Sequence, residues 1–92
     1  MSRADEPEQK FRTLQSKLKV FHDWPTEYLF KFIVPQEKLG ELEAIFEGHD
    51  FRTRSSKHGR WVSLTCARTM DSSEAVIEVY RAVDRIEGAY SL

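Results

Sequence analysis

The sequence lacks most of the features that place a small protein in a specialised class. It has a single cysteine, Cys66, so it can form no intramolecular disulfide and has no second thiol for a structural zinc site. No stretch approaches the roughly 20 apolar residues of a membrane span, and the opening MSRADEPEQK is charged where a signal peptide would be apolar. These absences predict a cytoplasmic protein in a reducing compartment, with no membrane partner.

A charge excess of one sign is also missing. The 92 residues hold 14 lysines and arginines against 15 aspartates and glutamates, a net charge of −1. The molecule as a whole is therefore not drawn to nucleic acid or to an anionic membrane, and any such binding needs a local basic patch. A chain of this length forms one domain with one core and leaves no room for a large internal active-site cavity.

The groupings that support metal binding or catalysis are missing as well. His22, His49 and His58 fall on different predicted elements, and no two of them are three or four residues apart. Cys66 is expected to point into the core, where a thiolate would be costly, and the carboxylates of the predicted helices are spaced as on solvated faces. We therefore predict no catalytic residue, no metal, no cofactor and no enzymatic activity.

The N-terminal region combines a polar start with an amphipathic stretch. Residues 1–9 are predicted to be a flexible tail because they are polar and include Pro7. An apolar stripe at helical spacing then predicts a helix over residues 10–22. The stripe consists of Phe11, Leu14, Leu18 and Phe21. Pro25 breaks the pattern, so we predict a single domain, 10–92, with its core in residues 24–92.

The rest of the chain alternates between patterns of period two and helical periodicity. The predicted strands are 28–34, 50–56, 60–69 and 89–92, and the predicted helices are 36–48 and a segment between a cap at Asp71 or Ser72 and a stop at Gly88. Gly59 is expected at a positive φ in the hairpin turn. The order β-α-β-β-α-β predicts an α+β, ferredoxin-like, two-layer sandwich with a four-stranded antiparallel sheet, preceded by an extra N-terminal helix.

In such a sandwich both core helices lie on one face of the sheet, which leaves the other face open. Alternation along the third strand directs its more apolar set, Val62, Leu64 and Cys66, toward the helices. The residues expected on the open face are Trp61, Ser63, Thr65, Arg52, Arg54, Leu29, Lys31 and Ile33.

Three segments together are similar to the YbeD-like family of small bacterial proteins of unknown function. The matching residues are Trp24, Pro25 and Thr26, then Ser55, Ser56, Gly59, Trp61, Ser63 and Thr65, and finally Ile77, Tyr80, Ile86 and Gly88. The resemblance covers residues 24–92. It implies a ferredoxin-like fold similar to the ACT regulatory domains, which bind amino acids and dimerise, and it implies no known enzymatic activity.

Positive charge is concentrated around the predicted hairpin. From Asp50 to Thr69 there are five lysines and arginines and one aspartate. The candidate ligand-binding or partner-binding residues are Arg52, Arg54, Lys57, His58, Arg60 and Trp61. Several interpretations stay open: a solvated turn with Trp61 covered by the N-terminal helix, an open face buried by a second subunit, and an anion pocket around the turn.

A further alternative is single-stranded RNA binding on the open face, because RNA-recognition motifs share this element order. The third strand matches their signature poorly, since Leu64 stands where an aromatic residue belongs. We therefore predict a regulatory binding module, ACT-like, with an unidentified protein or small-molecule partner and a homodimer as a candidate state. RNA binding is the alternative function.

Overall fold

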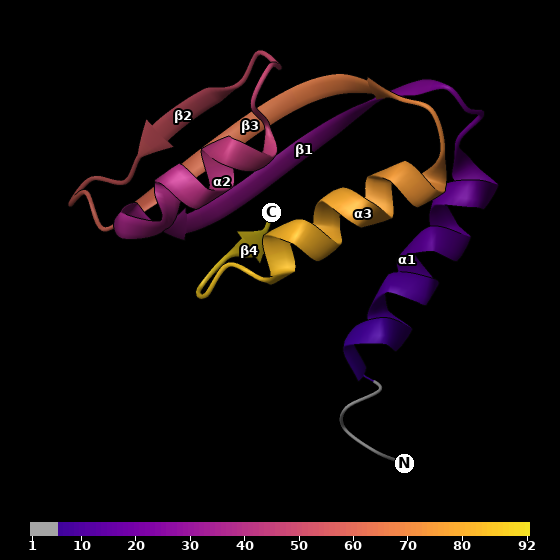
Figure 1. Cartoon of the computed structure of the whole chain (residues 1–92), viewed down its shortest axis with the longest axis horizontal. Coiled ribbons are helices and arrows are strands. Elements are labelled where there is room, and N and C mark those ends of the chain that lie inside the picture. The colour runs from indigo at the N-terminus through magenta and orange to yellow at the C-terminus, as the bar shows by residue number, and fades with distance from the viewer. Residues whose placement is uncertain (1–5) are drawn as a thin grey trace.

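Four antiparallel strands form one sheet in the order β2-β3-β1-β4 in the computed structural model, which describes residues 6–92 (Figure 1). The strands are β1 (Thr26–Pro35), β2 (Arg52–Ser55), β3 (Trp61–Met70) and β4 (Tyr90–Ser91). The helices are α1 (Glu6–Phe21), the short 3-10 turn η2 (Gln36–Lys38), α2 (Leu39–Ile45) and α3 (Ser73–Asp84). This architecture confirms the predicted ferredoxin-like α+β fold with an extra N-terminal helix.

The long strands β1 and β3 form the centre of the sheet. They pair along their whole length, from Thr26 opposite Met70 to Pro35 opposite Trp61. Side chains of successive strand residues point to opposite faces, and the apolar residues of these strands occupy alternate positions. One face of the pair is therefore continuously apolar and the other is mixed, which confirms the predicted assignment of faces.

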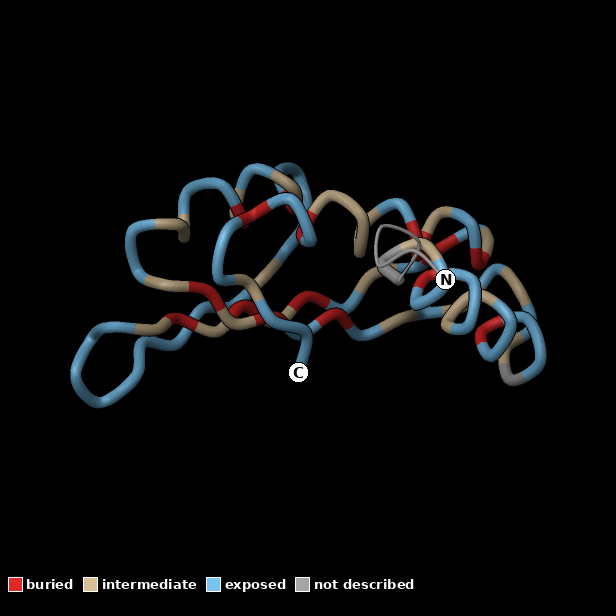
Figure 2. Tube along the Cα trace, turned by 90° about the horizontal axis from the view of Figure 1, so that it is seen from below, coloured by how far each residue is buried: buried red, intermediate tan, exposed pale blue. Residues whose placement is uncertain are grey.

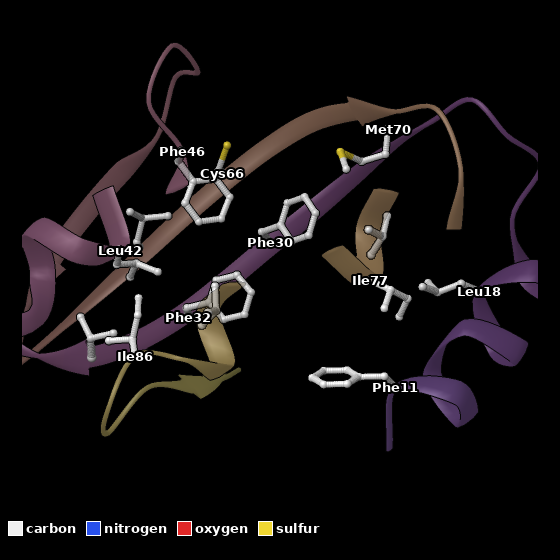
Figure 3. Packing of buried hydrophobic residues seen from close by; sticks show 14 residues of the cluster. Phe11, Leu18, Phe30, Phe32, Leu42, Phe46, Cys66, Met70, Ile77 and Ile86 are labelled. Atoms are coloured by element: carbon white, nitrogen blue, oxygen red, sulfur yellow. The ribbon is translucent and has the colours of Figure 1, made fainter. Parts of the chain in front are cut away.

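The core lies between this apolar face and the helices α2 and α3, which cover it from one side (Figure 2). Its centre is a group of aromatic rings from β1 and the end of α2 (Figure 3), against which Tyr80 of α3 packs. The Phe30 ring centroid lies 5.7 Å from that of Phe46 and 5.9 Å from that of Tyr80. Aromatic side chains bury large apolar areas and gain from tilted contacts, so this group ties both helices to the sheet.

The helix α1 packs against α3, at the end of the sheet where β1 begins and β3 ends (Figure 1). Phe11 and Leu18 of α1 are buried in the core cluster. The guanidinium of Arg81 lies 4.9 Å from the Phe11 ring centroid and donates two hydrogen bonds of 2.6 Å to the Glu8 carboxylate. These bonds hold the pKa of Glu8 below its usual value.

The interpretation in which the N-terminal helix covers Trp61, one of those left open above, is therefore wrong. Trp61 begins β3 at the end of the sheet away from α1, and it is only partly covered. One side of α3 packs on the sheet. The apolar residues of α1 contact a different side of α3, the side that carries Ile77 and Arg81. A helix needs one apolar surface for its stripe, and α3 supplies it.

Several element boundaries also differ from the predictions. The helix α1 begins at Glu6, so the predicted tail is wrong for residues 6–9, while residues 1–5 and the side chain of Phe21 lie outside what the structure describes. Ser72 caps α3, its hydroxyl accepting from the Ala75 N–H at 3.1 Å. Gly59 has the predicted positive φ of 71°. Within residues 6–92, no helix combines the length and apolar character needed to cross a membrane.

Candidate functional site

The sheet face away from α2 and α3, here called the open face, carries side chains in rows that run across the strands. Arg52 on β2 pairs with Thr65 on β3, which pairs with Lys31 on β1. The neighbouring row is Arg54, Ser63 and Ile33. Residues directly opposite in a sheet point to the same side, so the register brings residues from three strands together on one surface.

Three cations gather around a hollow on the open face, here called the basic hollow. Its volume is about 340 Å³, and it is lined by Lys31, Arg52, Thr53, Arg54, Ser63 and Thr65. Among the residues that the structure describes, no carboxylate lies within 4.0 Å of the charged groups of Lys31, Arg52 or Arg54. The hollow thus combines unneutralised positive charge with hydroxyl groups, as an anionic group would need.

An aromatic pair lies at one end of the open face. The Trp61 ring centroid is 6.2 Å from that of Tyr90, which comes from β4, and Tyr90 is 61% exposed. A second hollow of about 180 Å³ borders Trp61 and shares Arg54 with the basic hollow; its lining is Ile33, Arg54, Ser55, Ser56, Trp61 and Ser63. Arg54 therefore lies between a charged region and an aromatic one.

The six sequence-predicted site residues separate into two groups. Arg52, Arg54 and Trp61 line the hollows of the open face, whereas Lys57, His58 and Arg60 are exposed on the hairpin beyond the sheet and line neither hollow. The turn is closed by local bonds, since the Ser56 hydroxyl accepts from the Trp61 N–H at 3.2 Å. The charge run in the sequence therefore does not form one continuous site.

Two further residues belong with the site. The sequence predicts Lys31 on the open face but not among the candidate residues, and it does not single out Tyr90. Lys31 belongs to the site because β1 is adjacent to β3. Tyr90 belongs to it because β4 pairs with β1 at Ile33. The alternation of Leu29, Lys31 and Ile33 along one strand could have indicated that Lys31 belongs to the site. The strand order that brings Tyr90 beside Trp61 is a tertiary property and leaves no such pattern in the sequence.

Two titratable groups inside the fold, Cys66 and Tyr28, are in surroundings that favour their neutral forms. Burial raises the pKa of the Cys66 thiol, and Cys66 lies in the core as predicted. Burial, and then a 3.0 Å hydrogen bond with the Tyr80 hydroxyl, raises the pKa of Tyr28. Within residues 6–92, no three histidine, cysteine or carboxylate side chains gather as metal ligands.

The burial of Cys66 has a measurable consequence. We expect the native protein to resist alkylation by iodoacetamide at pH 8, because the thiolate is the reacting form and both burial and the raised pKa keep its population low. Alkylation should become fast in denaturant, and mass spectrometry of timed samples measures both rates. Equal rates in the two conditions would place the thiol at the surface.

Comparison of the sequence with known families gives a family assignment. Residues 19–90 match the family model described as "Protein of unknown function (DUF493)". No curated protein and no solved structure matches the chain. The matched range contains β1, β2, β3, α2 and α3 and most of the open face, and it confirms the resemblance to the YbeD-like family. The chain therefore belongs to the DUF493 family of proteins of unknown function.

Proposed function

We propose that this chain is a non-catalytic binding module of the cytoplasm that holds an acidic segment of another protein on its open face. The observation that carries this proposal is the basic hollow, where Lys31, Arg52 and Arg54 adjoin without a carboxylate within 4.0 Å among residues 6–92. Cations placed side by side raise the local potential and attract an anionic partner. A regulatory role of the ACT-like kind would follow if occupancy of this face controls assembly.

The surroundings of the basic hollow favour a polypeptide over a free small molecule. Exposed apolar side chains flank the cations, with Leu29 on one side and the Trp61 and Tyr90 pair on the other. Interfaces between proteins combine such aromatic and aliphatic anchors with a polar, charged rim. A single small anion would contact the hollow and leave these anchors in water.

Single-stranded RNA is a second candidate, and the aromatic pair favours it. Trp61 lines one hollow with Arg54 and pairs with Tyr90 on its other side, and bases can stack on exposed aromatic rings beside cations. An RNA complex would also weaken with salt, because bound phosphates release counterions. A direct comparison of peptide and RNA probes is therefore needed.

The test uses a fluorescein-labelled decaglutamate peptide and a labelled ten-nucleotide oligouridine, titrated with the protein at low salt. We expect decaglutamate to bind and oligouridine to bind more weakly. The double variant Arg52→Glu with Arg54→Glu should weaken decaglutamate binding by at least about tenfold, since attraction is replaced by repulsion. Fluorescence anisotropy measures each affinity.

A matched control is available on the hairpin. The double variant Lys57→Glu with Arg60→Glu changes the net charge by the same amount but leaves the basic hollow intact. It should retain decaglutamate binding within a few-fold. Equal losses of decaglutamate affinity in the two double variants would mean that net charge alone attracts the probe. Tighter binding of oligouridine than of decaglutamate would contradict the peptide proposal and support single-stranded RNA as the ligand.

A further inference from the structure

Three hollows follow one another along the open face. The basic hollow is the middle one, and the hollow beside Trp61, here called the Trp61 hollow, shares Arg54 and Ser63 with it. A third hollow of about 360 Å³, here called the Leu29 hollow, shares Arg52 and Thr65 with the basic hollow on its other side. The lining of the Leu29 hollow is Leu29, Asp50, Phe51, Arg52, Thr65 and Ala67. Because neighbouring hollows share residues, the three form one continuous trough.

The trough follows β3, which lies between β1 and β2 (Figure 1). On the open face β3 carries the small side chains of Ala67, Thr65 and Ser63 in succession. Longer side chains flank them in the register of the sheet, namely Leu29, Lys31 and Ile33 from β1 and Arg52 and Arg54 from β2. Residues on one face of a strand are about 7 Å apart, so the trough has a repeat of about 7 Å.

The two ends of the trough are apolar, whereas its middle carries the three cations of the basic hollow. Leu29 and Ala67 are paired across the strands at one end, and Ile33 and Trp61 line the Trp61 hollow at the other. Leu29 is 61% exposed, and covering such an aliphatic side chain removes apolar surface from water. Each end therefore favours an apolar group of the ligand, and the middle favours an acidic one.

A single carboxylate limits the acidic part of the ligand. Asp50 is the one acidic residue that lines any of the three hollows among residues 6–92, and it lies in the Leu29 hollow. Like charges placed side by side repel each other, so a glutamate that extends past the basic hollow toward Leu29 would be disfavoured. The acidic stretch should be short and should not continue to this end.

We propose that the trough binds one extended segment of another protein in which two acidic residues lie between two apolar ones, all four at alternate positions. Alternate side chains of an extended chain point to the same side about 7 Å apart, which matches the repeat of the trough. The acidic residues meet the cations, and the apolar residues enter the Leu29 and Trp61 hollows. This inference rests on the proposed function and deepens it, since the basic hollow is the middle of the same site.

A second copy of this chain fits the trough less well. A two-fold dimer through the open face would bring the same patch of both copies together, so two cationic surfaces would meet. Such an arrangement of like charges is unfavourable. A segment of opposite charge avoids this cost and can reach all three hollows at once.

The probe is the acetylated and amidated heptapeptide Leu-Ser-Glu-Ser-Glu-Ser-Leu, whose pattern is the same from either end, so both chain directions are allowed. Its control is Leu-Glu-Ser-Ser-Ser-Glu-Leu, which has the same composition and charge but directs the glutamates away from the side of the leucines. Titrations of the ¹⁵N-labelled protein measure both affinities. We expect the probe to bind at least about tenfold more tightly than the control, with shifts of the Ser63, Thr65 and Ala67 amide signals.

A pair of protein variants tests the apolar end. Ala67→Gln places a longer side chain in the Leu29 hollow, and it should lower the affinity for the probe to that for the control peptide. Thr69→Gln is the matched variant, because Thr69 is the next residue of β3 on the same face and lines none of the three hollows. It should keep the affinity for the probe within about twofold. Both positions are exposed, so both variants should fold.

Four outcomes would contradict the inference. Equal binding of the two heptapeptides, with decaglutamate still bound, would overturn the alternating pattern and leave the proposed function standing. Unchanged affinity of Ala67→Gln for the probe would remove the Leu29 hollow from the site. Binding of oligouridine but of neither heptapeptide would assign the trough to single-stranded RNA. Failure of both heptapeptides and of decaglutamate to bind would remove the inference and the proposed function together.

Discussion

Replacing Phe11 by alanine should lower the free energy of unfolding by about 3–5 kcal/mol, the usual cost of removing a buried phenylalanine side chain. Phe11 is 6% exposed and lies between α1 and α3, with the Arg81 guanidinium 4.9 Å from its ring centroid. Its loss removes a central contact of the α1 and α3 interface. Urea denaturation followed by circular dichroism measures the change, and an unchanged slope would show that the denatured state is unaffected.

Two other alanine variants control this experiment. Val20→Ala changes an exposed residue of the same helix and should alter stability by less than about 0.5 kcal/mol. Trp61→Ala should cost about 1 kcal/mol, because the ring is only partly covered. A cost near 4 kcal/mol for Trp61→Ala with little effect of Phe11→Ala would instead place the N-terminal helix on the open face.

Replacing Phe30 by alanine should be at least as damaging, with an expected loss of about 4–5 kcal/mol. Phe30 is fully buried at the centre of the aromatic group, and its ring centroid lies 4.8 Å from that of Tyr28 in addition to its contacts with α2 and α3. A domain of this length has a total stability of roughly 5–14 kcal/mol. The variant should therefore be close to unfolding at 37 °C.

The matched control for Phe30 is its neighbour in the chain. Leu29→Ala alters a side chain that is 61% exposed on the open face and should change stability by less than about 0.5 kcal/mol. Thermal melts of the two variants under one buffer condition provide the comparison. Similar losses in both would contradict the assignment of faces along β1.

The assignment of strand faces was predictable because it rests on a local property. Alternation in β1 and β3 sets which residues share a face, and a shift of one residue would expose the whole apolar set. Residues such as Phe32 and Leu64 could therefore be placed in the core before any partner was known. The turn at Gly59 was predictable for the same reason, since a positive φ is a requirement of the turn itself.

The position of α1 was not predictable from its own stripe. An amphipathic helix specifies that one side must be covered but does not specify by what. Two apolar surfaces were available, the open face around Trp61 and the outer side of α3 around Ile77. The second also offers charged partners, with Arg81 bound to Glu8 and Asp84 3.3 Å from Lys10. These pairs join residues far apart in the sequence.

The candidate site was predictable only in part, for a related reason. Arg52 and Arg54 were found because they alternate along one strand, whereas Lys57, His58 and Arg60 were grouped with them only by proximity in the chain. The structure separates these two sets, since a hairpin tip extends beyond the sheet it connects. Lys31 and Tyr90 are part of the site because of the order of the strands in the sheet, and no local sequence pattern indicates that order.

The amino-acid sequence alone specifies the order of elements and the faces of the central strands, because each depends on residues close together in the chain. Packing between distant segments sets the position of α1 on α3 and the contact of Tyr90 with Trp61. The physical reason is that these outcomes depend on which of several suitable surfaces come together. That choice depends on packing and charge pairing between segments distant in the sequence.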